Sequence, residues 1–217
     1  MRAFRSLVLL ASAVVLSASS TPRDAAPNMT FFIASAGPGD GANLGGLAGA
    51  DRHCATLAAS VNASARTWRA YLSAKAANGQ PAINARERIG TGPFINAAGA
   101  TVAKDLAELH AETNGLGKEG SLNEKGAKVD GRGDTPNMHD ILTGSMPDGT
   151  LASDTLDTTC TNWTSNSPTG SAFVGHHDKQ GGGVRPTSWN SAHPSRGCGQ
   201  ANLQATGGNG LFYCFGY

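Results

Sequence analysis

Four cysteines limit what this chain can fold into more than any other feature. They are Cys54, Cys160, Cys198 and Cys214, and all of them follow an apolar leader at the start of the chain. An even number of cysteines in an exported protein is typical of a disulfide framework, and four cysteines can pair in three ways. Because no two of them have the C-x-x-C spacing of a zinc knuckle, we favour disulfides over a thiolate metal site. These residues alone leave the pairing open.

The leader is the sequence MRAFRSLVLLASAVVLSASS, residues 1–20. Two arginines precede an apolar run from Leu7 to Leu16, and small residues follow this run. The pattern predicts a secretory signal peptide that is cut near Thr21. The run is too short to span a bilayer, and no later stretch has the length of a spanning helix. We therefore expect a secreted or periplasmic protein without a membrane span.

Charge and composition narrow the possible partners. The chain has 17 basic and 16 acidic residues, a formal net charge of +1. Nucleic-acid binders concentrate excess positive charge, so we expect no nucleic-acid partner. Glycine occurs 29 times and aromatic residues make up 6% of the chain. This composition favours a loop-rich fold over a helical bundle.

The hydrophobic pattern predicts a single α+β domain at residues 29–217, after a polar lead-in at residues 21–28. Apolar residues from Leu47 to Val61 follow a helical period, which places Cys54 on the buried face of a helix. The remaining predicted elements of the first half are strands at 29–36 and 67–74, a short helix at 85–89, a hairpin at 93–103, a helical segment at 105–112 and a long polar loop at 113–137.

The second half of the chain differs from the first. It contains short β-type runs separated by glycine and asparagine, namely HDILTGS, TCTNWTS, GSAFVGHHD and GLFYCFGY. No fixed-period repeat or change of composition marks a second domain. We therefore expect early helices and a late, irregular antiparallel sheet.

Several of these segments resemble a known family. GLAGADRHCATLAAS followed by ARTWRAYLSA is similar to the opening of the endostatin domain of collagens, which has a C-type-lectin-like fold. The run from HDILTGS to TCTNWTS, then GSAFVGHHD and GLFYCFGY, is similar to the second half of that domain. The chain also resembles secreted bacterial proteins described as lectins. This resemblance covers residues 29–217 and implies a nested disulfide pairing, Cys54 with Cys214 and Cys160 with Cys198.

The resemblance also implies carbohydrate binding assisted by calcium. In C-type lectins, a Trp-Asn-Asp strand and a Glu-Pro-Asn segment supply oxygens to the ion, which needs six to eight of them. Here Trp189 and Asn190 match the first two strand positions, and Ser191 departs from the third. Thr135-Pro136-Asn137 is the nearest match to the other segment and lacks its acid. Trp189 and Asn190 either form part of a sugar site or fill the core and cap a turn.

Histidines occur next to this region, in the segment GHHDKQGGG at residues 175–183. Strand alternation sends His176 and His177 to opposite faces, so the two do not readily bind one metal ion together. His177 and Asp178 are candidate ligand-binding residues, and the alternative is that they are surface or hydrogen-bonded residues. The sequence gives no metal-site spacing for the other histidines, which are His53, His110, His139 and His193.

The segment GRGDTPNMHD, residues 131–140, contains the tripeptide Arg132-Gly133-Asp134 that integrins read. A glycine-rich turn with paired charges explains the same letters. Asp134, Asn137 and Asp140 are candidate oxygen donors for a calcium ion in the long loop, with Asn137 also a candidate ligand-binding residue.

The leading hypothesis is a non-catalytic, secreted lectin whose partner is a carbohydrate or glycoconjugate. The sequence contains no nucleophile elbow, phosphate loop or H-E-x-x-H motif, so we expect no enzyme. One alternative is an adhesin that binds host matrix or serum proteins through the same domain. Another is a metal-dependent enzyme, which stoichiometric zinc in the purified protein would support.

Overall fold

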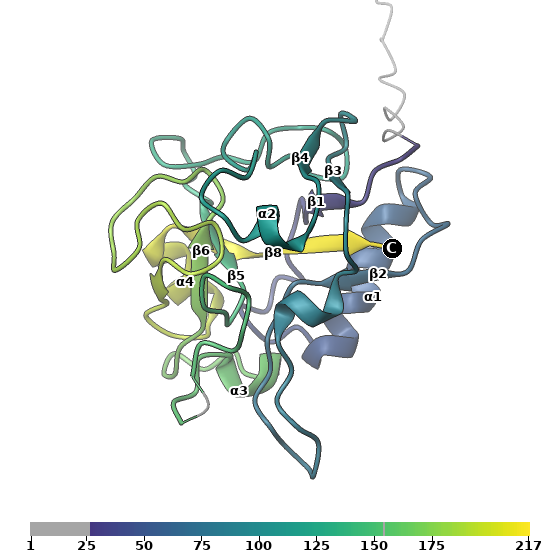
Figure 1. The fold of residues 1–217 in the computed structure, drawn as a ribbon. Helices are drawn as coiled ribbons and strands as arrows, with labels where there is room; N and C mark the ends of the chain where they lie inside the picture. The colour runs from purple at the N-terminus through teal and green to yellow at the C-terminus, as the bar shows by residue number, and fades with distance from the viewer. Residues whose placement is uncertain (1–26, 154) are drawn as a thin grey trace, which may run out of the picture.

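One long strand, β8 (Gly208–Gly216), organises the molecule. The computed structural model describes residues 27–153 and 155–217, and β8 crosses the middle of this part of the chain (Figure 1). Its apolar sequence, GLFYCFG, leads the strand into the protein interior, and nearly all its residues are buried. The predicted signal peptide and most of the predicted lead-in lie outside the described residues.

Short elements surround this strand. The helical elements are α1 (Gly46–Ala59), η1 (Ala85–Arg88), α2 (Leu106–Leu109), α3 (Cys160–Trp163) and α4 (Gln200–Thr206). The other strands are β1 (Phe31–Ile33), β2 (Trp68–Ala70), β3 (Phe94–Ile95), β4 (Thr101–Ala103), β5 (Asp140–Leu142), β6 (Phe173–His176) and β7 (His193–Pro194). The mixed α+β class predicted from the sequence is confirmed.

The main sheet has the order β1-β8-β5-β6-β7, and β2 also pairs with β8. The last part of β8 lies between β1 and β2, so that Cys214 is opposite both Phe32 and Ala70. The first part of β8 pairs with β5, with Gly208 opposite Asp140. This pair is parallel, unlike the antiparallel arrangement expected for the whole sheet. The chain between β5 and β8, which contains β6, β7 and α4, provides the long crossover that a parallel pair requires.

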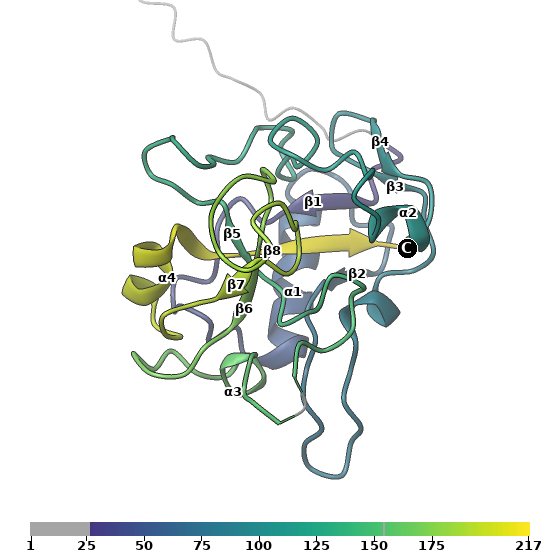
Figure 2. The same ribbon diagram turned by 60° about the vertical axis from the view of Figure 1, so that its left-hand side comes forward.

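Two disulfides fix this arrangement. Cys54 lies on the buried face of α1 and bonds to Cys214 of β8, and α1 lies behind β8 in Figure 2. Cys160 of α3 bonds to Cys198, which precedes α4. The nested pairing that the family resemblance implied is therefore confirmed.

Hydrophobic side chains cover both faces of the sheet. Neighbouring residues of β1 and β8 alternate between two clusters, because successive side chains of a strand point to opposite faces. Phe32 and Cys214 belong to the cluster packed on α1, whereas Phe31, Tyr213 and Phe215 belong to an aromatic cluster on the other face.

One local prediction was wrong, and one helix was not predicted. The segment TCTNWTS was expected to be β-type, but residues Cys160–Trp163 have φ values between 47° and 66° and form a left-handed turn. The helix α4 was not expected, because Leu203 is its only buried residue and leaves no hydrophobic period to detect.

The other first-half predictions agree with the structure more closely. The β3–β4 hairpin forms where it was expected, and α2 is shorter than the predicted 105–112. The long loop 113–137 contains no helix or strand among its described residues and meets β1 through a bridge between Asn123 and Ile33. Within the part of the chain that the structure describes, no helix is long and apolar enough to cross a membrane.

The disulfides generate a stability prediction. Cys160 and Cys198 are separated by 38 residues and Cys54 and Cys214 by 160. Loop-closure entropy therefore predicts that replacing Cys160 and Cys198 by serine lowers the free energy of unfolding by up to about 4 kcal/mol. Replacing Cys54 and Cys214 by serine should lower it by up to about 5 kcal/mol. Equilibrium urea unfolding followed by tryptophan fluorescence measures both. An unchanged unfolding midpoint in either double variant would contradict the prediction.

Candidate metal centre

Strand pairing brings a carboxylate and two histidines together at one end of the sheet. Asp140 of β5 is directly opposite His176 of β6, so the two side chains share a face. Val174 is opposite His193 of β7 and lies on the same face as His176, two residues further on. The register of three short strands thus places Asp140, His176 and His193 around one point.

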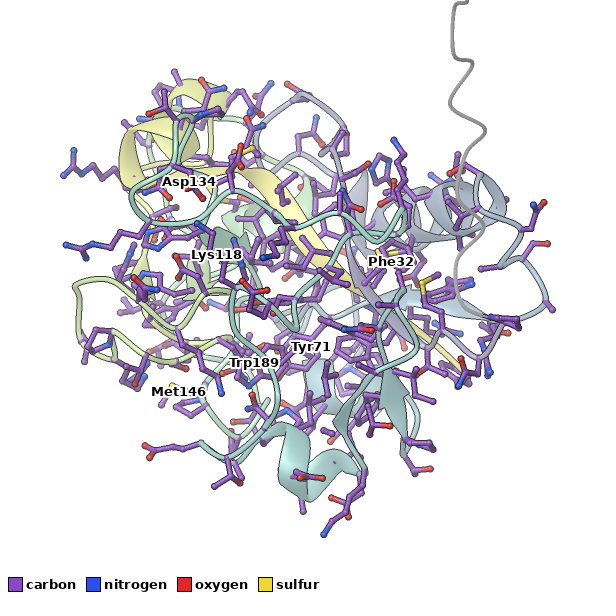
Figure 3. All side chains as sticks on the ribbon, turned by 90° about the horizontal axis from the view of Figure 1, so that it is seen from above. Phe32, Tyr71, Lys118, Asp134, Met146 and Trp189 are labelled. Carbon is purple, nitrogen blue, oxygen red and sulfur yellow. A yellow bond between two sulfur atoms is a disulfide. The ribbon has the colours of Figure 1, made fainter. Side chains whose placement is uncertain are left out.

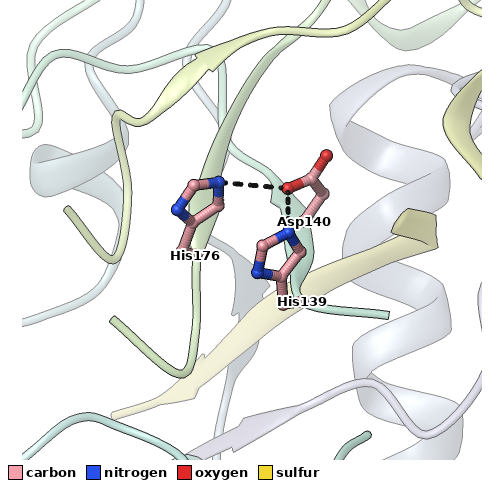
Figure 4. A group of neighbouring side chains, drawn as sticks. All are labelled: His139, Asp140 and His176. Atoms are coloured by element: carbon pink, nitrogen blue, oxygen red, sulfur yellow. Dashed lines mark ion pairs between the residues drawn. The ribbon is translucent and has the colours of Figure 1, made fainter. Parts of the chain in front are cut away.

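A third histidine reaches the same point from outside the strands. His139 precedes β5, so strand alternation does not turn its ring to the opposite face from Asp140. Its Nε2 atom lies 3.2 Å from Oδ1 of Asp140. The corresponding distances from Nε2 to this oxygen are 3.3 Å for His176 and 3.5 Å for His193. Figure 4 shows His139 and His176 converging on Asp140.

The second nitrogen of each ring faces an oxygen that can only accept a hydrogen bond. Nδ1 of His176 lies 2.7 Å from the Pro186 carbonyl oxygen, and Nδ1 of His193 lies 3.0 Å from that of Pro194. Nδ1 of His139 lies 3.4 Å from Oδ1 of Asp178. In a neutral imidazole the two carbonyl partners hold the proton of His176 and of His193 on Nδ1 and leave Nε2 with its lone pair. Nδ1 of His139 has no hydrogen-bond partner among the described residues. The Nε2 lone pairs of His176 and His193 then face the Asp140 carboxylate, and Nε2 of His139 lies at a similar distance from it.

This arrangement leaves a conflict in the centre of the cluster. Asp140 and His176 are buried, and within the described residues neither Asp140 oxygen nor Nε2 of His176 has a hydrogen-bond partner. Lone pairs that face one another in a buried site are costly, and a cation or an added proton between them would relieve this cost.

A proton on His193 would satisfy one contact of Asp140, but protons on both His139 and His176 would place two charges side by side. The rings of His139 and His176 stack with centroids 4.3 Å apart and planes 7° from parallel. Two imidazolium ions in this position repel each other, and burial adds a desolvation cost for each charge. A single metal ion would satisfy the nitrogens and the carboxylate at once.

Charge effects support an ionised Asp140. Burial opposes ionisation of this carboxyl, but its contacts with His176 and His193 outweigh burial and lower the pKa of Asp140. Contact with Asp140 in turn raises the pKa of His193. The cluster therefore holds a carboxylate whose negative charge faces the histidines.

Glycines make room for the rings. A Cβ atom at Gly181 would lie 2.4 Å from Cε1 of His176, and one at Gly183 would lie 2.9 Å from Cδ2 of His193. Both glycines have positive φ, at 149° and 90°. The glycine-rich segment after Asp178 is thus required by the histidine packing as well as by its backbone.

The cluster forms the floor of a cavity of about 550 Å³. His193 has 20% of its side chain exposed to it, compared with 7% for His139 and 0% for His176. The site is therefore accessible from the His193 side.

Trp189, a predicted ligand residue, lies in the aromatic cluster. Its ring centroid is 4.9 Å from that of Tyr71 and 5.1 Å from that of Tyr213, and 4% of the residue is exposed. Tyr71 and Trp189 lie side by side in Figure 3. The small exposed part of Trp189 lines a second cavity, of about 460 Å³.

Asn190, the neighbouring predicted ligand residue, is tied into the fold. Its amide nitrogen lies 2.9 Å from the Tyr71 hydroxyl and 3.1 Å from the carbonyl oxygens of Met146 and Pro147. Its amide oxygen accepts a hydrogen bond from Ser188. Burial raises the pKa of Tyr71, so its neutral hydroxyl links Asn190 to Nε2 of His110. Asn190 lines the second cavity with its polar atoms already engaged.

His177 and Asp178 lie next to the candidate metal centre and do not belong to it. His177 points away from His176, as alternation predicted, with its Nε2 atom 3.1 Å from the Asp130 carbonyl oxygen. Burial lowers the pKa of His177. Asp178 accepts hydrogen bonds from the backbone amides of Arg132 and Gln180 and faces His139. It is therefore placed to orient the His139 ring.

The remaining predicted residues separate into two groups. Asn137 lines the cavity over the metal centre, and Asp140 lies at its base. Asp134 instead pairs with Lys118 and accepts from the backbone amide of Gly131 (Figure 3). The carboxylate of the Arg132-Gly133-Asp134 tripeptide is thus held by its own loop.

Sequence reasoning did not group His139, His176 and His193 with Asp140. Their spacing follows no linear metal motif, because three strands and the segment before β5 supply them. The usable signal was the sequence HD at the start of one predicted β-type run and HH at the end of another, which meet if the two runs pair antiparallel.

Comparison with known proteins gives no assignment for this chain. None of the known family models matches it, and no curated protein sequence matches it.

The contacts of Asn190 predict a structural cost for its removal. Asn190→Ala leaves the Tyr71 hydroxyl and two carbonyl oxygens in the protein interior with one partner fewer, so we expect a loss of about 1–3 kcal/mol in the free energy of unfolding. Urea unfolding measures it, with the exposed Asn28→Ala as the matched control. If both variants unfold at the same urea concentration, the structural role of Asn190 is refuted.

Proposed function

We propose that this protein binds a first-row transition-metal ion, with zinc as the leading candidate, through Asp140, His139, His176 and His193. The observation that carries the proposal is the convergence of three Nε2 atoms on one buried carboxylate oxygen, while each Nδ1 atom faces an acceptor. Metal-bound histidines typically direct their second ring nitrogen to a carbonyl or carboxylate oxygen in this way.

The distances fit a small ion. Zinc bonds to histidine nitrogen and carboxylate oxygen at about 2.0–2.2 Å, so two ligands of a tetrahedral site lie roughly 3.3 Å apart. The three separations from Asp140 Oδ1 are 3.2, 3.3 and 3.5 Å. Among the described residues, the ligand atoms of His139, Asp140 and His176 all lie within 4.8 Å of one another. His193 is not in this group, so its ring would have to move toward the other two histidines to complete a site with four ligands.

The donor set selects among ions. Imidazole nitrogen suits zinc, copper, iron and nickel, whereas calcium takes six to eight oxygens. A cluster of three histidines and one aspartate therefore favours a transition metal over the calcium expected from the resemblance. Calcium binding at another site of the chain is still only a prediction.

A zinc titration tests the proposal. We expect EDTA-treated, dialysed protein to bind one zinc ion per chain in isothermal titration calorimetry. Asp140→Asn and His193→Ala each remove a direct ligand, so each should weaken binding by roughly 100-fold or more. His193 is the most exposed ligand, which makes His193→Ala the variant least harmful to folding.

The control is His53→Ala, because His53 lies on α1 and contacts the Ala36 carbonyl oxygen and the Phe212 ring. It should bind zinc like the unchanged protein. Absence of stoichiometric zinc binding by the unchanged protein, or equal binding by the His53 and His193 variants, would overturn the proposal. Excess calcium should not displace the zinc.

We also propose that the domain is C-type-lectin-like, of the endostatin-like kind, and that the protein is exported. Support comes from the α+β class and the nested disulfides, which are typical of proteins from oxidising compartments. Carbohydrate binding is the second candidate function. The cavity beside Trp189 supports it, because a partly apolar wall with several polar groups suits a small ligand.

A glycan array, probed with and without EDTA, tests the second function. We expect at least one glycan to bind above background, and Thr187→Trp to abolish this binding by filling the cavity that exposed Thr187 lines. Thr169→Trp, also at an exposed position, is the control. Binding that survives in the Thr187 variant would remove this cavity as the sugar site, and no binding at all would remove the function. Pull-down from serum or matrix extract tests the adhesin alternative.

A further inference from the structure

We infer that the cavity over the metal centre binds a compact oxyanion, a carboxylate or phosphate group, against the ion and between Arg132 and Arg196. The inference rests on the proposed metal binding and names the class of ligand that the same site takes. It follows from the charge, the free donors and the accessibility of this cavity.

The cavity wall is positive. Arg132 and Arg196 line it together with the three histidines, and no acidic residue is among its lining residues. Asp140 lies below them with its carboxylate directed to the histidines. A divalent ion would more than offset the charge of this carboxylate, so the cavity would attract an anion.

Its hydrogen-bond donors are free. Both arginines are exposed, and among the described residues neither guanidinium group has a hydrogen-bond or ion-pair partner. Asn137 also lines the cavity, and its amide oxygen accepts from the backbone amide of His139. Its amide nitrogen has no hydrogen-bond partner in the described part of the chain, which leaves a further donor. Arginine and amide donors match the oxygens of carboxylate and phosphate groups.

The chain as a whole favours a small anion over a polyanion. With 17 basic and 16 acidic residues it has no general excess of positive charge that would hold nucleic acid or a sulfated polysaccharide. The cavity volume of about 550 Å³ is of the size that small-molecule sites have. The most exposed metal ligand, His193, lies on the side from which such a molecule would enter.

Three ligands built on one sugar frame test the inference. D-glucuronate carries a carboxylate, D-glucose 6-phosphate a phosphate, and D-glucose no charge. Each is titrated calorimetrically into zinc-loaded and into EDTA-treated protein, without excess zinc. We expect one or both anions to bind the zinc-loaded protein, binding to weaken at least tenfold after zinc removal, and D-glucose not to bind. The stronger of the two anions identifies the source of the oxyanion.

Arginine variants locate the ligand. Arg132→Gln and Arg196→Gln should each weaken anion binding by about tenfold, the effect of losing one charge-assisted hydrogen bond. Arg52→Gln, at an exposed position of α1 outside the cavity, should bind the anion unchanged. Zinc affinity, measured separately, should stay within about twofold in all three variants, because none of these residues touches the cluster.

The outcomes separate the two proposals. If the protein binds zinc but no anion, this inference is overturned and the proposed metal binding stands. The same holds if anion binding is unchanged by zinc removal or by the two arginine substitutions. A failure of the zinc titration overturns metal binding itself. In that case the anion inference, which places the ligand on the ion, falls with it.

Discussion

The bond between Cys54 and Cys214 is the constraint on which the rest of the structure depends. It holds α1 against β8, the one strand that pairs with β1, β2 and β5. Since β8 begins opposite Asp140 and ends between β1 and β2, it joins the half of the domain that contains α1 to the half that contains the metal centre. The disulfide adds to the two hydrophobic clusters that span both halves, in a sheet whose strands pair over three residues or fewer.

A bound metal ion would link the segment between Cys160 and Cys198 to the chain that precedes it. His176 and His193 lie between Cys160 and Cys198, whereas His139 and Asp140 come from the chain before this loop. An ion held by all four residues would connect β5, β6 and β7 at the end of the sheet where β6 and β7 pair over two residues. An ion that binds only the folded chain adds its binding free energy to the stability of that chain. Without an ion the facing lone pairs destabilise the folded chain, and a bound ion would stabilise it.

The sequence predicted what local patterns determine. A helical period marked α1 and put Cys54 on its inner face, and apolar runs marked β1, β2 and β8. Local patterns could not predict α4, whose single buried residue leaves no period, or the left-handed turn at Cys160–Trp163. For the candidate metal centre, strand alternation correctly predicted that His176 and His177 point to opposite faces. From the sequence, however, His177 and not His176 is the candidate ligand residue. His176 lies opposite Asp140, which is 36 positions earlier in the sequence. This pairing depends on the register between two strands, and the sequence of neither strand alone predicts it.

The two cavities differ in a way that favours the candidate metal centre over the cavity beside Trp189 as a ligand site. Around Trp189, the polar groups are already bonded within the protein: Asn190 to Tyr71, Lys179 to the carbonyl oxygens of Glu112 and Asn114, and Arg185 to Ser191. Polar groups that satisfy one another specify a fold, and using them for a ligand means breaking the bonds they make. Over the metal centre, the buried acceptors and the exposed donors have no such partners within the described residues. Since buried polar groups in folded proteins are seldom left unpaired, the unpaired ones there favour a partner from outside the chain.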